Sequence, residues 1–204
     1  MTEKCVQTEK IRDRYNRTAA YYDYMDKMIS PALRRKALAH ARGHVLEVGV
    51  GTGANLQYYP PECKVTAIDF SPGMLKRAHT KLGQAKASVE LVEMDAQNMD
   101  FADNTFDTVV STCVFCSVPD PVKGLQEVRR VCKKEGQIIL LEHVRSDNPL
   151  IGKLMDILNP VSLQLVGSNI NRRTLENIDL AGITPERIED YHGKIVKLII
   201  AKPY

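Results

Sequence analysis

The stretch HVLEVGVGTGANLQYYP, residues 44–60, decides the fold class. Its first five residues are mostly apolar and predict a short buried strand. Three glycines follow at alternate positions, Gly49, Gly51 and Gly53. Glycine adopts positive φ and lets a ligand approach the main chain closely. At the end of a strand in an open α/β sheet, such a loop predicts a site for a ligand that contains a nucleoside.

The rest of the chain alternates between strand-like and helix-like segments. Short β-rich runs are expected at residues 44–48, 64–69, 88–95, 106–115 and 137–144, and helices at residues 71–83 and 120–136. Two more strands near the C-terminus are joined by a short His-Gly turn, so they must pair antiparallel. The pattern predicts an α/β fold with a doubly wound, mostly parallel sheet of seven strands that ends in an antiparallel hairpin.

The 204 residues suit a single domain with a substantial core. We expect one domain over residues 1–204, built from a Rossmann-like core at 44–204 and a helical lid at 1–43. The lid segment is rich in tyrosine, and its pattern predicts two or three helices with a break at Pro31.

Charge is spread unevenly along the chain. The whole sequence carries a net charge of +3, but residues 1–43 alone carry +5. This segment is therefore expected to contact an anionic membrane surface, although a solvated helical face explains the charge equally well. The residues considered for that contact are Met28, Ile29, Leu33, Arg34, Arg35 and Lys36.

Composition narrows the class of protein further. No apolar run approaches the ~20 residues of a membrane span, and the N-terminus lacks the apolar segment of a secretory signal. The five cysteines are scattered, so a secreted disulfide framework is not expected. Together these observations predict a cytoplasmic protein, peripheral at the inner membrane surface. The CVFC run at 113–116 has a redox or zinc spacing, but it lies in a strand-like segment without a second pair. We therefore expect buried thiols there and no metal, and the low charge argues against nucleic acid as a partner.

Glu47 bears on the choice of ligand. Gly49, Gly51 and Ala54 also match the dinucleotide pattern G-x-G-x-x-G/A, with Asp69 at a suitable distance for a ribose hydroxyl. A carboxylate at the end of a buried strand would repel the pyrophosphate of a dinucleotide, and it would suit a cation. S-adenosylmethionine carries a sulfonium and an ammonium and no phosphate. Glu47 therefore favours S-adenosylmethionine, with S-adenosylhomocysteine as the product, over a nicotinamide cofactor.

Four segments, taken in order, resemble the successive motifs of the class I S-adenosylmethionine-dependent methyltransferases. They are VLEVGVGTG, VTAIDFSPGML, VEMDAQNMDFADNTFDTVVS and RRVCKKEGQIILLEHV. The resemblance is close over residues 44 to 144 and looser elsewhere.

This resemblance implies a role for several residues. The three loop glycines would pass beneath the methionine portion of the ligand, and Cys113 would lie near it. Asp69 would accept both ribose hydroxyls, and Phe70 would flank the adenine. Asp95 would accept the adenine amino group, while Ala96 would donate its backbone N–H. Each acid could instead cap a helix or form a turn.

The N-terminal segment bears on the methyl acceptor. AAYYDYMDKMISPALRR, residues 19–35, resembles the same segment of bacterial phospholipid N-methyltransferases and of quinone C-methyltransferases. In that resemblance Tyr15, Tyr22 and Asp23 would close over the cofactor. Tyrosine faces could also hold a cationic amine. Packing of the helix on the sheet is the alternative role of these side chains.

Segments around the fourth and fifth strands resemble the phospholipid enzymes and the membrane-associated thiol methyltransferases of animals. They are FCSVPDPVKGLQEVRRV and LLEHVRS. His143 lies at the end of the fifth strand and could accept a proton from an ammonium or a thiol; a structural histidine is the alternative. We expect a lipophilic or small acceptor, first the amine of phosphatidylethanolamine, then a small thiol or a quinone ring. A non-catalytic sensor of the cofactor is the hypothesis of another class.

Overall fold

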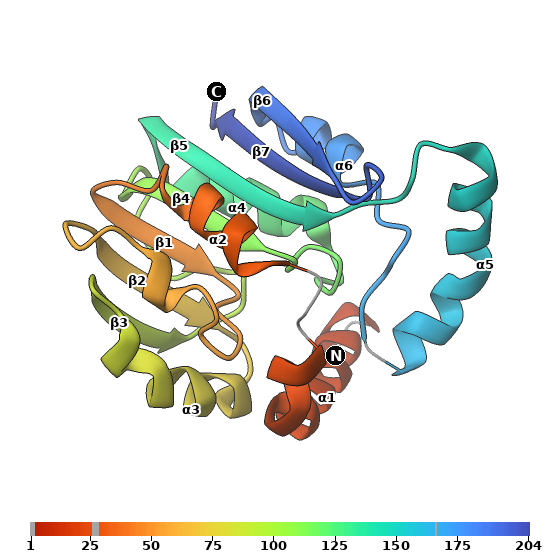
Figure 1. Cartoon of the computed structure of the whole chain (residues 1–204), viewed down its shortest axis with the longest axis horizontal. Coiled ribbons are helices and arrows are strands. Elements are labelled where there is room, and N and C mark those ends of the chain that lie inside the picture. Colours follow the sequence, from red (N-terminus) through yellow and green to blue (C-terminus); the bar gives the residue numbers. More distant parts are fainter. Residues whose placement is uncertain (1–2, 26–28, 166) are drawn as a thin grey trace.

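The computed structural model describes residues 3–25, 29–165 and 167–204, and it contains one seven-stranded sheet. The strand order is β3-β2-β1-β4-β5-β7-β6 (Figure 1). The strands are β1 (His44–Val48), β2 (Lys64–Asp69), β3 (Ser88–Glu93), β4 (Phe106–Thr112), β5 (Cys132–His143), β6 (Thr184–Tyr191) and β7 (Val196–Lys202). Strands β1 to β5 pair in parallel, and β7 pairs antiparallel with both β5 and β6. The predicted doubly wound sheet with its C-terminal hairpin is confirmed.

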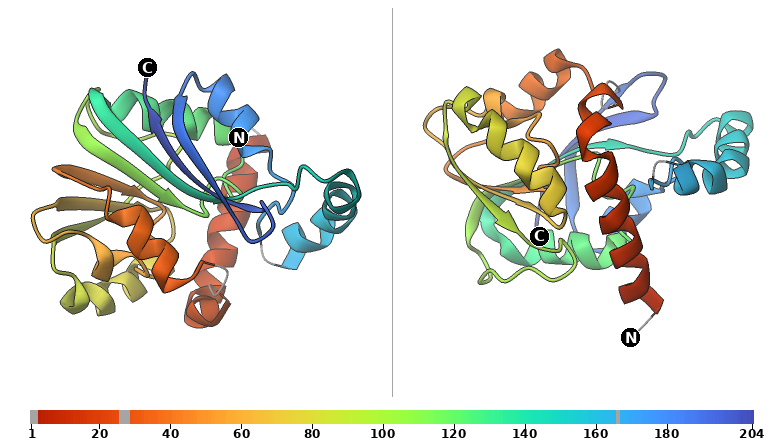
Figure 2. Two further views of the ribbon diagram at one scale, coloured as in Figure 1. Left: turned by 45° about the horizontal axis from the view of Figure 1, so that its top comes forward. Right: turned by 90° about the horizontal axis from the view of Figure 1, so that it is seen from below.

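Helices cover both faces of the sheet, and two further helices lie beyond its edges (Figures 1 and 2). The helices are α1 (Glu3–Met25), α2 (Pro31–Leu38), α3 (Pro72–Lys81), α4 (Pro121–Val131), α5 (Pro149–Leu165) and α6 (Thr174–Leu180), with short 3-10 turns at Leu56–Tyr58 and Leu82–Gln84. Apolar side chains of α2 and α3 share one buried cluster with the sheet, and those of α4 and α6 share the other. None of the described helices is long and apolar enough to cross a membrane.

Local sequence explains where the helices of the core begin. Ser71 and Asp120 act as N-caps, because their side chains accept hydrogen bonds from the backbone N–H groups of Met74 and Lys123. A proline follows each cap at the first helical position, where its missing N–H costs nothing. The chain therefore turns into a helix shortly after a strand has ended, and this keeps the strand ends at one edge of the sheet.

The boundary between α4 and β5 differs from the prediction. The helix was expected to reach Gly136, but it ends at Val131, and β5 begins at Cys132. Cys132 is fully buried and pairs with Phe106 at the start of β4. Burial of this pair in the core outweighs the helical propensity of the basic residues that follow.

The structure removes three residues from the membrane-facing patch expected on residues 28–36, although Arg35 and Lys36 are exposed. Ile29 and Leu33 are buried in the core, and Arg34 is buried as well. Lys36 forms an ion pair with Glu189 on β6. Helix α2 is therefore part of the packed domain, and of the predicted lid it is α1 that lies across the strand ends (Figure 2). Met28 and the side chain of Asp23 lie outside the described residues.

Candidate active site

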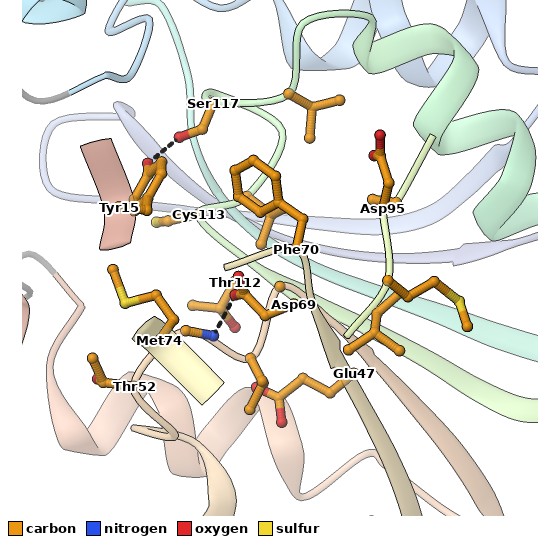
Figure 3. A pocket seen from close by; sticks show the side chains of 18 of the residues that line it. Tyr15, Glu47, Thr52, Asp69, Phe70, Met74, Asp95, Thr112, Cys113 and Ser117 are labelled. Atoms are coloured by element: carbon orange, nitrogen blue, oxygen red, sulfur yellow. Dashed lines mark hydrogen bonds between the residues drawn. The ribbon is translucent and has the colours of Figure 1, made fainter. Parts of the chain in front are cut away.

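A pocket lies at the carboxyl ends of β1 to β4, with about 900 Å³ of empty volume. It spans the point where the strand order reverses between β1 and β4, which is where open α/β sheets bind their ligands. Figure 3 shows Glu47 and Thr52 toward one end of the pocket and Tyr15 and Ser117 toward the other.

The glycine loop after β1 forms one wall of the pocket. Gly49, Gly51 and Gly53 have φ values of +69°, +55° and +81°, in the left-handed region that favours glycine. A Cβ on Gly53 would lie 3.1 Å from the Ala78 Cα of α3, so this glycine also lets the loop pack on the helix. A Cβ on Gly51 would meet nothing within 4 Å. Gly51 therefore leaves its backbone open to the pocket.

Glu47 lies beneath this loop in a buried polar cluster. Its side chain is 1% exposed, and Oε1 accepts a hydrogen bond of 2.8 Å from Asn55 Nδ2. Asn55 Nδ2 also donates to Thr112 Oγ1, and Asn55 Oδ1 accepts from Arg34 Nη1. Glu47 Oε2 is buried as well. Burial raises the pKa of Glu47 to about 7, although the hydrogen bond from Asn55 and the nearby Tyr59 hydroxyl act to lower the pKa of this carboxyl.

Asp69 closes the second strand and holds the glycine loop in place. Its Oδ2 accepts a hydrogen bond of 2.9 Å from the Gly51 N–H, and its Oδ1 accepts one of 2.9 Å from the Ser71 N–H. Burial raises the pKa of Asp69 to about 6, although these hydrogen bonds favour the ionised form. The Phe70 backbone is a third donor to this carboxylate, which still keeps a lone pair for a ligand hydroxyl.

The side chains that follow β2 and β3 form the next part of the wall. Phe70, Asp95, Ala96 and Gln97 all line the pocket. Asp95 accepts hydrogen bonds from the backbone and side-chain nitrogens of Gln97. The structure thus brings together the predicted cofactor-binding residues from four different strand ends, except Gly53, which packs against Ala78 and does not line the pocket.

Helix α1 covers the pocket with one stripe of side chains. Thr8, Tyr15 and Tyr22 line the cavity and are spaced by seven residues, which places them on the same helix face. The Tyr15 hydroxyl lies 2.5 Å from Ser117 Oγ on the loop after β4 (Figure 3). The Tyr15 ring packs edge-on against Phe70, with 6.0 Å between centroids. Burial raises the pKa of Tyr15 well above its ordinary value, so the phenol stays protonated.

The loop after β4 forms the remaining wall. Cys113 lines the pocket and has a φ of +54°, which is unusual for a residue with a side chain. Glu142, fully buried on β5, accepts hydrogen bonds from Ser111 Oγ and from the Val114 N–H. Burial raises the pKa of Glu142 to about 7. Glu142 thus anchors the start of this loop from behind.

The structure does not place His143 at the reaction centre, where the sequence predicted it. Its side chain is buried and is not among the residues that line the pocket. Successive side chains of a strand point to opposite faces, so Glu142 faces the side of α4 and α6 while His143 faces the side of α2. Burial lowers the pKa of His143. Its role as a proton acceptor stays a prediction that the pocket geometry does not support.

Several residues that line the pocket were not predicted from the sequence. Asn55 lies only two residues after Gly53, and a polar side chain that follows a glycine loop is a signal that could have been used. Arg34 and Ser117 offered no such signal. Arg34 meets Asn55 only because α2 folds back on the sheet, and Ser117 meets Tyr15 across 102 residues of chain.

The chemistry of the pocket fits S-adenosylmethionine. Carboxyl groups lie at the ends of three neighbouring strands, and Glu47, Asp69 and Asp95 all line the pocket, where they suit a positive charge and hydroxyl groups. The backbone of Gly51 faces open space, where a ligand can lie against it. A Rossmann-like sheet with this set of groups defines a protein that binds a nucleoside-containing cation.

Comparison with known proteins identifies a methyltransferase domain. A family model described as a methyltransferase domain matches residues 46–140. A phosphatidylethanolamine N-methyltransferase of Cereibacter sphaeroides is 42% identical over 133 residues, which are 63% of this chain and 66% of that protein. Thiol S-methyltransferase TMT1B of Rattus norvegicus is 35% identical over 71% of this chain and 62% of its own length. The matched part of the chain thus spans about two thirds or less of the length of each of these relatives.

The fold has relatives among solved structures. An S-adenosylmethionine-dependent methyltransferase of Thermotoga maritima has a TM-score of 0.71 at 19% identity, over 94% of this chain and 99% of that one. The chain contains a methyltransferase domain, and its fold is that of the class I S-adenosylmethionine-dependent methyltransferases, which implies S-adenosylmethionine as the cofactor. The nicotinamide alternative is not supported.

Proposed function

We propose that the protein transfers a methyl group from S-adenosylmethionine to a lipophilic acceptor, in the first place the amine of phosphatidylethanolamine. The relative with 42% identity bears the name of that activity. A small thiol is the second candidate acceptor, because two mammalian relatives are named thiol S-methyltransferases. A quinone ring is the third, because a demethylmenaquinone methyltransferase is 28% identical.

One observation carries the proposal: the two ends of the pocket differ in chemistry. Acidic groups lie at the strand ends, while tyrosines of α1 and the loop after β4 enclose the other end. In this arrangement Asp69 would hold the ribose hydroxyls, Asp95 and Ala96 would hold the adenine beside Phe70, and Glu47 would face the methionine end. The acceptor would then approach from the side of Tyr15 and Tyr22.

The residues of this chain would act mainly by positioning. S-adenosylmethionine supplies a methyl group on a sulfonium, which an acceptor lone pair displaces in line. Such a reaction gains most when both partners are held close together and water is excluded. The contact between Tyr15 and Ser117 closes the pocket over the strand ends, and tyrosine faces would attract an ammonium headgroup. That ammonium must lose a proton before its nitrogen can attack.

Isotopic labelling tests the proposal. Protein, S-adenosylmethionine with a labelled methyl group and a lipid extract are incubated with and without small thiols, and the label is traced. Label in methylated phosphatidylethanolamine is the expected result. Label confined to thioethers would assign the protein to the thiol enzymes. Tight cofactor binding without any label in lipid, thioether or quinone would favour the sensor.

The expected cellular setting also stays a proposal. We place the protein in the cytoplasm, in peripheral contact with an anionic inner membrane surface and without a nucleic-acid partner. Exposed cationic side chains on α1, Lys10, Arg12 and Arg17, support an electrostatic contribution from residues 1–43.

A further inference from the structure

Helix α5 exposes one continuous apolar face. Its exposed large side chains have relative exposures from 46% to 82%, and they are Leu150, Ile151, Leu154, Ile157, Leu158 and Val161. Their spacing of three, four and seven residues places them on one side of the helix. Gly152 and Met155, on the opposite side, are buried. The helix therefore packs on the protein with one face and offers the other to its surroundings.

This face is unusual within the described part of the chain. Nine large apolar side chains are exposed there, and six of them lie on α5. Scattered apolar residues are ordinary on a protein surface, whereas a contiguous patch marks an interaction site. The charges that border the patch do not oppose an anionic partner, because Lys153 is exposed and Asp156 is paired with Arg145 at 2.8 Å.

The same helix is connected to the acceptor end of the pocket. Asn159 on α5 donates a hydrogen bond of 3.0 Å to Asn169, and the backbone N–H of Asn169 donates to the Cys116 carbonyl. Arg172 donates to the carbonyls of Cys116 and Val118, which flank Ser117. The segment after α5 therefore supports the wall that meets Tyr15.

Helix α5 also contacts the lid. The Arg14 guanidinium of α1 donates a hydrogen bond to the Leu163 carbonyl near the end of α5. Both helices lie beyond the carboxyl ends of the parallel strands (Figure 1). The C-terminal end of α5 is therefore in contact with the lid that encloses the acceptor.

We infer that the apolar face of α5 inserts into the surface of a phospholipid bilayer and docks the enzyme there. This inference rests on the proposed function, since a phosphatidylethanolamine acceptor resides in such a bilayer. The helix is too short and too polar to span the membrane, so it lies in the plane of the headgroups, as amphipathic helices do. The exposed cations of α1 and Lys153 add attraction to anionic lipids.

A lipid surface suits this face better than a second protein does. A stable protein interface uses roughly 20 to 30 residues on each side, whereas this patch has six large side chains on one helix. A bilayer accepts an isolated helix face without a complementary groove.

Flotation with lipid vesicles tests the inference. The triple variant L150Q/L154Q/I157Q is compared with the wild type on vesicles of phosphatidylethanolamine and phosphatidylglycerol, at low and high salt. The matched control is L180Q/I188Q, which changes exposed apolar residues on α6 and β6. We expect the triple variant to lose about tenfold or more in vesicle affinity, because each apolar side chain withdrawn from the interface lowers it. The control should change less than about twofold.

Three results would overturn the inference. They are an absence of vesicle binding by the wild type, unchanged binding of the triple variant, and a wild-type dimer in solution that the triple variant dissociates. Cofactor affinity and melting temperature should stay unchanged in both variants, which shows that the fold is intact.

A second assay separates this inference from the proposed function. Methylation of phosphatidylethanolamine in detergent micelles does not require docking on a bilayer, so the triple variant should keep its activity there within about threefold. Micellar activity without vesicle binding by the wild type would refute docking and leave the proposed acceptor standing. Vesicle binding without methylation of lipid in either form would refute the acceptor and support docking alone.

Discussion

The strand-end part of the pocket and the part that covers it are built in different ways. Asp69 binds the backbone of Gly51 and Ser71, and Glu47 binds Asn55, so these contacts join residues that lie 2 to 18 positions apart. The covering part depends on Tyr15 and Ser117, which are 102 positions apart. The difference teaches that cofactor binding is encoded in short motifs, whereas acceptor selection depends on how distant segments meet.

The largest effect is expected at Asp69, in the strand-end part. Asp69→Ala removes the acceptor for two backbone N–H groups and, in the proposed arrangement, for the ribose hydroxyls. Hydrogen bonds to charged groups contribute about 1.5–3 kcal/mol each, so the Kd for S-adenosylmethionine should rise about 100-fold or more. Calorimetric titration measures this Kd. Asp100→Ala, at an exposed position, is the control. A rise of less than threefold in a folded Asp69→Ala variant would mean that the ribose is held elsewhere.

The next prediction tests whether the negative charge of Glu47 contributes to cofactor binding. The pKa of this carboxyl is about 7, so it is mostly neutral at pH 6.5 and ionised at pH 8.5. A cationic ligand prefers the ionised form, and cofactor affinity should therefore rise with pH through this range. Glutamine cannot ionise. The affinity of the wild type relative to Glu47→Gln should grow about fourfold between the two pH values.

The comparison of the two proteins at each pH cancels the titration of the ligand itself and of Asp69. A ratio that stays constant with pH would show that Glu47 does not face the positive charge. Circular dichroism at both pH values checks that Glu47→Gln remains folded.

An effect of similar size is expected at the covering part. Tyr15→Phe keeps the ring and removes the hydrogen bond to Ser117, whose contribution of about 1 kcal/mol corresponds to about fivefold in kcat/KM for the acceptor. The Kd for S-adenosylmethionine should change less than threefold. Ser117→Ala should have a similar effect, and the double variant should lose no more than either single variant. Additive losses would mean that the two hydroxyl groups act independently.

The smallest effect is expected at His143. Its ring is buried on the α2 face of the sheet and is absent from the pocket wall as described, so His143→Asn should change kcat/KM less than about twofold. Steady-state methylation rates from pH 6 to 9 measure this. A loss of 100-fold or more, with the fold and the cofactor Kd unchanged, would instead support a proton-accepting role.

Sequence reasoning succeeded where neighbouring residues determine the structure. The strands of the sheet and the start of α3 at Ser71 follow from apolar runs and capping residues. The end of α4 did not follow, because Cys132 leaves the helix to pair with Phe106 in the core. The basic residues 34–36 were assigned to a surface, but the packing of α2 buries Arg34 under the pocket.

The sequence by itself determined the class of fold, the glycine loop and the acids at the strand ends, because these features depend on local periodicity and on turns that only certain residues can form. The tertiary structure decided which side chains meet over the pocket, how Arg34 and Asn55 support Glu47, and that α5 presents an apolar face. These features arise from segments that meet only in the folded chain, 102 positions apart for Tyr15 and Ser117 and 21 for Arg34 and Asn55, or from which face of a helix is left uncovered. Periodicity alone carries no information on either.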